Sequence, residues 1–279
     1  MNPPPPLLFT RESGLARITL NRPDAANTLN PEMSRALFDA AIECDEDASI
    51  RAVLLTGNGP LFCGGGDIHG FAAAGARVSH LAKEMTTILH GAVSRLARMG
   101  KPLVVAVNGP AAGAGLSLAM LGDIVIAAPA AHFTVAYTAI GLTPDLGASW
   151  LLPRLVGLRR AQELALTNRR VGAQEAAAIG LITRVADDPQ AEALTVARTL
   201  AQGRARRWPA PGRCWRAAFP PGWRSRWNGK PAPLPPPCAA RKGRRALRPF
   251  WPSVRRIFRN HANLAAPQGR MPKSWLMRR

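Results

Sequence analysis

Apolar runs alternate with turn residues along the first 200 positions of the chain. Ala52–Thr56 and Leu103–Val107 are short apolar stretches, and each is followed by a turn rich in Gly, Asn and Pro. Such stretches are typical of strands that are buried on both faces. Met85–Leu96 and Pro189–Leu200 instead repeat their apolar residues at helical spacing. The pattern predicts an α/β domain.

A loop of very small residues follows each of the two predicted strands. The first, Phe62–Ile68, reads FCGGGDI, and the second, Ala111–Gly115, reads AAGAG and leads into a helix that we expect to begin near Ala114. Small side chains let a ligand approach backbone N–H groups, and the first N–H groups of a helix have no helical acceptor. Two such donors that converge on one oxygen form an oxyanion hole. Taken singly, each loop is equally consistent with a tight packing corner or a simple turn.

Several ordered motifs extend this pattern: ITLNRPDAANTLN (18–30), LFCGGGDI (61–68), KPLVVAVNGPAAGAGLSLAMLGDIVIA (101–127), HFTVAYTAIGLTPDLGASWLLPRLVG (132–157) and RRAQELALTNRRVGAQEAAAIGLITRV (159–185). Together they resemble the crotonase superfamily, the enoyl-CoA hydratase/isomerase group of acyl-CoA enzymes. The resemblance implies a crotonase-type spiral of ββα turns and an acyl-CoA thioester substrate. It implies no separate cofactor, because coenzyme A is part of the substrate. It also implies a homotrimer or hexamer, if the C-terminal region permits one.

The resemblance also assigns residues to the site. The thioester carbonyl is expected between the peptide N–H groups of Gly66 and Ala114. The coenzyme A moiety is expected along the backbone of the residues that match the first two motifs, namely Ala25, Ala26, Gly64, Gly66 and Ile68.

Family hydratases carry two catalytic glutamates, and the matching positions here hold Ser117 and Tyr137. Neither side chain serves as a carboxylate acid or base near neutral pH, since the tyrosine hydroxyl titrates near 10. The sequence therefore disfavours simple hydration of an enoyl-CoA.

Asp145 matches the aspartate that dienoyl-CoA isomerases, phenylacetate-pathway isomerases and 4-chlorobenzoyl-CoA dehalogenases use. A single carboxylate can move a proton between two carbons of an enolate, which shifts a double bond. We therefore expect Asp145 to be the catalytic acid/base of an enoyl-CoA isomerase, closest in motif to the phenylacetate-pathway type. The alternative is a loop aspartate that caps the next helix.

His90 matches the general base of the dehalogenases, which hold a tryptophan where Tyr137 stands. His90 with Asp145 is thus a candidate hydrolytic pair, with Tyr137 as an accessory residue. Because His90 lies in the helical run Met85–Leu96, we favour a histidine whose hydrogen bonds are satisfied on a half-buried helix. The four cysteines form no CxxC pair and the other histidines show no ligand spacing, so no metal site is predicted.

Composition divides the chain after residue 200. All 17 acidic residues precede this point, and 20 of the 37 basic residues follow it, so the formal charge of +20 lies entirely in residues 201–279. This segment is rich in Pro, Arg and Trp and shows neither helical nor strand periodicity, which predicts an irregular C-terminal region. We therefore divide the chain into a crotonase-like acyl-CoA-binding core, 1–200, and a basic segment, 201–279.

Arg with interleaved Trp suits nucleic acid or an anionic membrane. We favour a different interpretation: an Ala- and Glu-rich helix read out of frame in a GC-rich gene acquires this composition. A frameshifted segment would then replace the family's terminal helices. Two readings of another class stay open, a non-catalytic product of a damaged gene and a basic nucleic-acid-binding protein. The start shows no signal peptide and no long apolar run is uninterrupted, so we expect a cytoplasmic protein without a membrane anchor.

Overall fold

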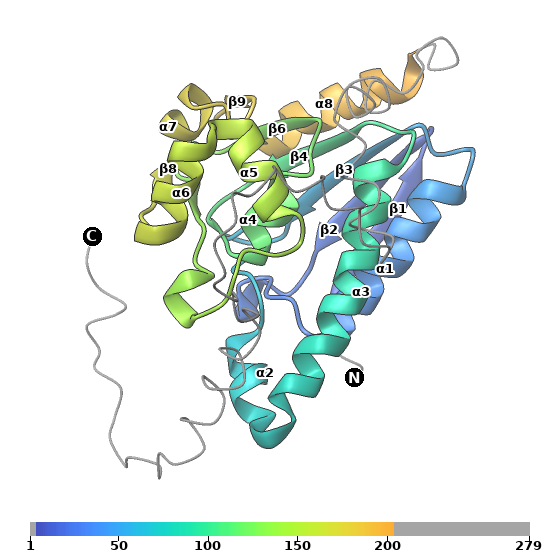
Figure 1. The fold of residues 1–279 in the computed structure, drawn as a ribbon. Coiled ribbons are helices and arrows are strands. Elements are labelled where there is room, and N and C mark those ends of the chain that lie inside the picture. Colours follow the sequence, from blue (N-terminus) through green and yellow to red (C-terminus); the bar gives the residue numbers. More distant parts are fainter. Residues whose placement is uncertain (1–3, 204–279) are drawn as a thin grey trace, which may run out of the picture. The chain divides into compact units, whose positions relative to one another are not determined.

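The computed structural model describes residues 4–203, which form an α/β unit (Figure 1). The larger sheet has the strand order β1 (Leu7–Glu12), β2 (Leu15–Leu20), β3 (Ala52–Gly57), β4 (Leu103–Val107), β6 (Ile124–Ala127) and β9 (Arg184–Val185). The smaller sheet has the order β5 (Ala111–Ala112), β7 (His132–Thr134) and β8 (Val171–Gly172).

The helices lie between and after these strands. They are η1 (Pro23–Ala25), α1 (Pro31–Glu46), α2 (Ile68–Ala73), η2 (Gly75–Arg77), α3 (Val78–Arg98), α4 (Ala114–Ala119), η3 (Thr138–Ile140), α5 (Ala148–Val156), α6 (Leu158–Thr167), α7 (Ala173–Ala178) and α8 (Pro189–Gln202).

The central strands of the larger sheet are buried on both faces, as their apolar runs predict. β1 and β2 are antiparallel, and β2, β3, β4, β6 and β9 pair in parallel. Because side chains alternate along a strand, Leu54 and Val104 enter one core whereas Leu55 and Val105 enter the other.

Helices cover the two faces of this sheet in different ways. α8 packs Ala193, Ala197 and Ala201 against one face, where the absence of long side chains lets the helix approach the strands closely. α1 and α3 pack on the opposite side (Figure 1), with Leu37 and Val93 in the larger core. This framework holds the carboxyl ends of β3 and β4, from which the two small-residue loops depart.

The predicted elements agree closely with the structure. Leu103–Val107 is confirmed at both ends, and β3 extends one residue beyond the prediction. The helix predicted over 85–96 is part of the longer α3, and the one predicted over 189–200 continues to Gln202. Our predictions for the basic segment concern residues outside the described range, apart from the few that complete α8.

Candidate active site

The two small-residue loops lie against each other. Cys63 and Ala111 form an isolated parallel bridge, and the Ala112 amide donates to the Cys63 carbonyl oxygen at 3.0 Å. A Cβ atom at Gly115 would overlap that same carbonyl oxygen, so glycine is what allows this approach. The tertiary structure thus brings together the two predicted donor loops, which are separated by almost fifty positions in the chain.

Gly66 is held between two hydrogen bonds that its neighbours make to Leu29. The Leu29 amide donates to the Gly65 carbonyl at 2.8 Å, and the Asp67 amide donates to the Leu29 carbonyl at 3.1 Å. Gly65 has a left-handed φ of 99°, and a Cβ there would lie 2.8 Å from the Ala112 oxygen and 3.5 Å from the Ala114 nitrogen. Within residues 4–203, neither the Gly66 nor the Ala114 amide donates a backbone hydrogen bond outside regular helices and strands.

The loop that carries Ala25 and Ala26 is built around a fully buried asparagine. The side-chain oxygen of Asn27 accepts from the Arg22 amide, and its nitrogen donates to the carbonyls of Asn58 and Leu61, each at 2.8 Å. Ala26 and Asn27 both adopt left-handed φ values, 52° and 51°. Asparagine tolerates this conformation better than most residues, so Asn27 after two alanines is a sequence signal for this loop, although the motifs alone did not indicate it.

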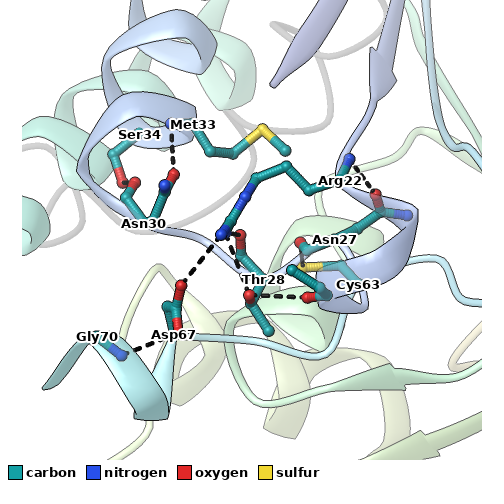
Figure 2. Close-up of polar contacts among 10 residues, drawn as sticks. Arg22, Asn27, Thr28, Asn30, Met33, Ser34, Cys63, Asp67 and Gly70 are labelled. Carbon is teal, nitrogen blue, oxygen red and sulfur yellow. Dashed lines mark hydrogen bonds and ion pairs between the residues drawn. The ribbon is translucent and has the colours of Figure 1, made fainter. Parts of the chain in front are cut away.

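An ion pair joins this loop to the first donor loop. Arg22 donates from Nη1 to the Thr28 carbonyl at 2.6 Å, and its Nη2 lies 3.3 Å from Asp67 Oδ2 (Figure 2). The other Asp67 oxygen accepts from the Gly70 amide at 3.1 Å and caps α2. The Gly64 amide also donates to the Ala26 carbonyl at 2.8 Å. The structure therefore gathers the expected coenzyme A residues at one place, where Ile68 begins α2 with 49% of its surface exposed.

We expect Arg22→Ala to lower the free energy of unfolding by about 2 kcal/mol, because a partly buried charged donor is lost. It should also raise the KM for acyl-CoA, because Arg22 holds the loop that is expected to bind coenzyme A against the first donor loop. Steady-state kinetics and urea denaturation measure the two effects. Arg95→Ala is the matched control, since Arg95 pairs with Asp45 and Glu46 at a more exposed site; it should cost about 1 kcal/mol or less and leave KM unchanged. An unchanged KM in Arg22→Ala would contradict the assignment of this loop to coenzyme A.

Ser117 and Tyr137, at the two hydratase glutamate positions, contact each other. Ser117 Oγ, on α4, lies 2.8 Å from Tyr137 Oη, and both residues are buried. Burial and then the charge of Asp145 raise the pKa of the Tyr137 hydroxyl far above its ordinary value. This pair is therefore neutral and hydrogen-bonded at neutral pH.

Asp145 presents an unpaired carboxylate oxygen next to this pair. Its Oδ1 is buried and accepts no hydrogen bond from residues 4–203, and its main-chain carbonyl lies 3.3 Å from Ser117 Oγ. Burial raises the pKa of Asp145 and outweighs the opposite influence of the Tyr137 hydroxyl and the His90 ring. A carboxylate with a raised pKa and an unpaired oxygen suits proton transfer.

His90 reaches Asp145 from α3. Its Nε2 lies 3.9 Å from Asp145 Oδ2 and accepts from the Leu146 amide at 3.4 Å, and 44% of the side chain is exposed. Both alternatives for His90 therefore have support: its ring nitrogen accepts a hydrogen bond, and the ring lies close to the candidate carboxylate.

No three His, Cys, Asp or Glu side chains within the described residues group to hold a metal ion. In the same part of the chain, no helix has the length and apolar character needed to cross a membrane.

The chain is similar to known proteins over most of its described length. Residues 10–219 match the family described as enoyl-CoA hydratase/isomerase, and this match ends inside the basic segment. A 1,2-epoxyphenylacetyl-CoA isomerase of Escherichia coli is 42% identical over 178 residues, 63% of this chain and 68% of that protein. A probable enoyl-CoA hydratase of Rhodobacter capsulatus is 44% identical over 175 residues, 63% and 66% of the two chains. The matched part thus spans about two thirds of these relatives.

Solved structures agree with the fold. An enoyl-CoA hydratase/isomerase from Mycobacterium paratuberculosis superimposes with a TM-score of 0.73 at 33% identity, covering 77% of this chain and 86% of that one. Another from Mycobacterium abscessus gives 0.71 at 32% identity, covering 80% and 88%. The predicted crotonase fold is confirmed for the described core. The chain belongs to the enoyl-CoA hydratase/isomerase family of the crotonase superfamily.

Proposed function

We propose that this enzyme shifts a double bond in an enoyl-CoA through an enolate, with Asp145 as the single acid/base. The observation that carries the proposal is the buried, unpaired Oδ1 of Asp145 beside a neutral Ser117–Tyr137 pair. A hydratase of this family uses two carboxylates, whereas an isomerase needs one group that removes a proton from one carbon and returns it to another.

The negative charge that develops on the thioester oxygen in the enolate must be stabilised by hydrogen-bond donors. The amides of Gly66 and Ala114 belong to loops that contact each other, and neither makes a loop hydrogen bond within the described residues. Preorganised donors of this kind stabilise an enolate oxygen more than the ground-state carbonyl. The main-chain carbonyl of Asp145 lies 3.3 Å from the hydroxyl of Ser117, which follows Ala114 by three residues on α4. Coenzyme A enters only as part of the substrate, with no separate cofactor.

Two other reactions on the same fold are the alternatives. Enoyl-CoA hydration is the activity in the names of several relatives, including the probable hydratase of Rhodobacter capsulatus. Dehalogenase-like hydrolysis would use Asp145 as nucleophile and His90 as base, and the 3.9 Å between Nε2 and Oδ2 favours it as the second candidate. The relative named 1,2-epoxyphenylacetyl-CoA isomerase directs the choice of substrates toward ring-bearing acyl groups.

A panel of aliphatic and ring-bearing enoyl-CoA thioesters, incubated in D2O, separates these reactions. Isomerisation predicts a product of unchanged mass apart from incorporated deuterium, with the double bond moved. Hydration in this solvent adds the mass of one D2O. A 4-chlorobenzoyl-CoA, assayed beside the panel, releases chloride in hydrolytic dehalogenation. A product that only gains water would refute the single-carboxylate isomerase.

The pH dependence of kcat should show an acid limb that belongs to Asp145. The carboxylate must be ionised to remove a proton, so activity rises as pH increases through its pKa. Because burial raises that pKa above the ordinary value, the limb should lie at a higher pH than for an exposed aspartate. A profile that is flat down to the ordinary aspartate range would contradict Asp145 as the base.

We further propose that the enzyme is cytoplasmic and that it assembles as a homotrimer or hexamer if residues 201–279 permit it. We also propose that it does not bind nucleic acid. The composition of that segment supports an out-of-frame origin. Reading the gene in its other two frames tests this: a continuation that restores the family's acidic terminal helix supports it, and no such continuation refutes it.

A further inference from the structure

The peptide group that joins Asp145 to Leu146 is held at both of its ends. Its N–H, which belongs to Leu146, donates to Nε2 of His90 on α3 at 3.4 Å. Its carbonyl oxygen, which belongs to Asp145, accepts from the Ala148 amide at 2.8 Å and lies 3.3 Å from the Ser117 hydroxyl on α4. Groups from α3, α4 and the start of α5 therefore converge on one peptide unit.

Leu146 has a backbone conformation that needs such support. Its φ is 47°, in the left-handed region that residues with a Cβ atom rarely adopt. The residue is almost fully buried in the larger core. Within residues 4–203, no backbone carbonyl accepts from the Leu146 N–H outside regular helices and strands. The His90 ring thus provides the acceptor for the N–H group of a buried residue, and an unpaired donor there would be costly.

The same geometry restricts the chemistry of the His90 ring. For Nε2 to accept from an amide, the ring must be neutral, with its proton on Nδ1. Nε2 has a single lone pair, which points to the Leu146 N–H in this arrangement. Oδ2 of Asp145 lies 3.9 Å from Nε2, which is beyond hydrogen-bond reach. Nε2 therefore contacts the backbone beside the candidate carboxylate and is not placed to remove a proton.

We propose that His90 is a positioning residue for Asp145, because it accepts from the Leu146 amide and so fixes the peptide group next to the candidate acid/base. On the other side of Asp145, the ring of Pro144 restricts the path of the incoming chain. The Cα–Cβ bond that carries the carboxylate then has little freedom. A carboxylate that is oriented before the substrate binds lowers the barrier to proton transfer. The inference rests on the proposed function, since it assigns Asp145 as the acid/base.

Two substitutions of His90 test the acceptor itself. Glutamine places its Oε1 as many bonds from Cα as Nε2 is in histidine, and Oε1 can accept from the Leu146 amide. Leucine has no acceptor and suits a helix equally well. Both variants remove the imidazole as a base and as a charge next to Asp145. A difference between the two variants therefore reports the hydrogen bond alone.

The kinetic readout uses the enoyl-CoA of the panel that the wild type converts fastest. His90→Gln should keep a kcat close to that of the wild type, whereas His90→Leu should lower kcat by about fivefold, the effect of one net hydrogen bond. KM should be the same in both, because the coenzyme A loops are untouched. Equal kcat values in the two variants would overturn the proposal: values near the wild type would show simple packing, and equally reduced values would show a base or charge effect.

Hydrogen–deuterium exchange of the Leu146 amide, followed by NMR, gives a readout that does not depend on turnover. The amide should exchange about fivefold faster in His90→Leu than in the wild type or in His90→Gln, because its acceptor is lost. The matched control is His80→Leu, which replaces an exposed histidine of the same helix. This control should leave kcat and the exchange rate unchanged. An exchange rate that is the same in all variants would also refute the positioning role.

The outcomes separate the role of His90 from the function on which it rests. If Asp145→Asn keeps its turnover, the proposed function fails, even when the exchange of the Leu146 amide responds to His90. If Asp145→Asn is inactive but His90→Gln and His90→Leu have equal turnover, only the positioning role is refuted.

Discussion

Asp145→Asn is expected to lower the turnover of enoyl-CoA isomerisation by about two orders of magnitude or more, because it removes the base while keeping the shape of the side chain. Affinity for acyl-CoA should change little, since the expected coenzyme A contacts are made by the loops of Ala26 and Gly64. Stopped-flow or steady-state assays give kcat, and calorimetry with a saturated acyl-CoA gives the affinity.

Asp188→Asn is the matched control. Asp188 caps α8 by accepting from the amides of Gln190 and Ala191, and asparagine caps helices equally well. Activity and stability should both persist in this variant. Turnover near that of the wild type in Asp145→Asn would instead refute a mechanism with a single carboxylate.

Gly115→Ala is expected to lower kcat by about two to three orders of magnitude, the effect of losing an oxyanion donor. The added methyl group would overlap the Cys63 carbonyl, which belongs to the backbone and cannot rotate away. The loops that carry Gly66 and Ala114 would therefore have to separate. Overpacking should also cost about 1–3 kcal/mol of stability, which thermal unfolding measures separately from kcat.

Gly172→Ala provides the comparison for this substitution. Gly172 precedes α7 with φ −69° and ψ 163°, and an added Cβ would meet nothing within 4 Å. The control should behave like the wild type in both assays. If Gly115→Ala loses stability but keeps its kcat, the two loops do not act together as the oxyanion hole.

Local patterns predicted most elements of the core. Leu103–Val107 was predicted at both ends, because a short apolar run bounded by turn residues has few other stable arrangements. The length of α3 was underestimated, because the prediction began at the first buried residue, Met85; Val78, Leu81 and Ala82 continue the helical spacing toward the N-terminus but are only half-buried and alternate with exposed residues. Boundaries that depend on exposed residues are the least visible in a sequence.

The polar supports of the site were not predicted. Asn27 is fully buried, and its partners Asn58 and Leu61 lie more than thirty residues away. The Arg22–Asp67 pair likewise links positions that are 45 residues apart. The periodicity of the sequence reveals neither contact, because side chains from different loops meet only after the strands beneath them have paired.

The sequence by itself determined the α/β class and predicted the two small-residue loops and the candidate carboxylate, since these follow from local spacing and from the motifs of the family. Only the tertiary structure decided that Ser117 contacts Tyr137 and that His90 reaches Asp145. The residues of these pairs are 20 and 55 positions apart, and the paths of α3, α4 and the loop before α5 bring them together. Burial, which raises the pKa of Asp145, has the same origin: it depends on what the folded chain places around a carboxylate and not on the residues next to it in sequence.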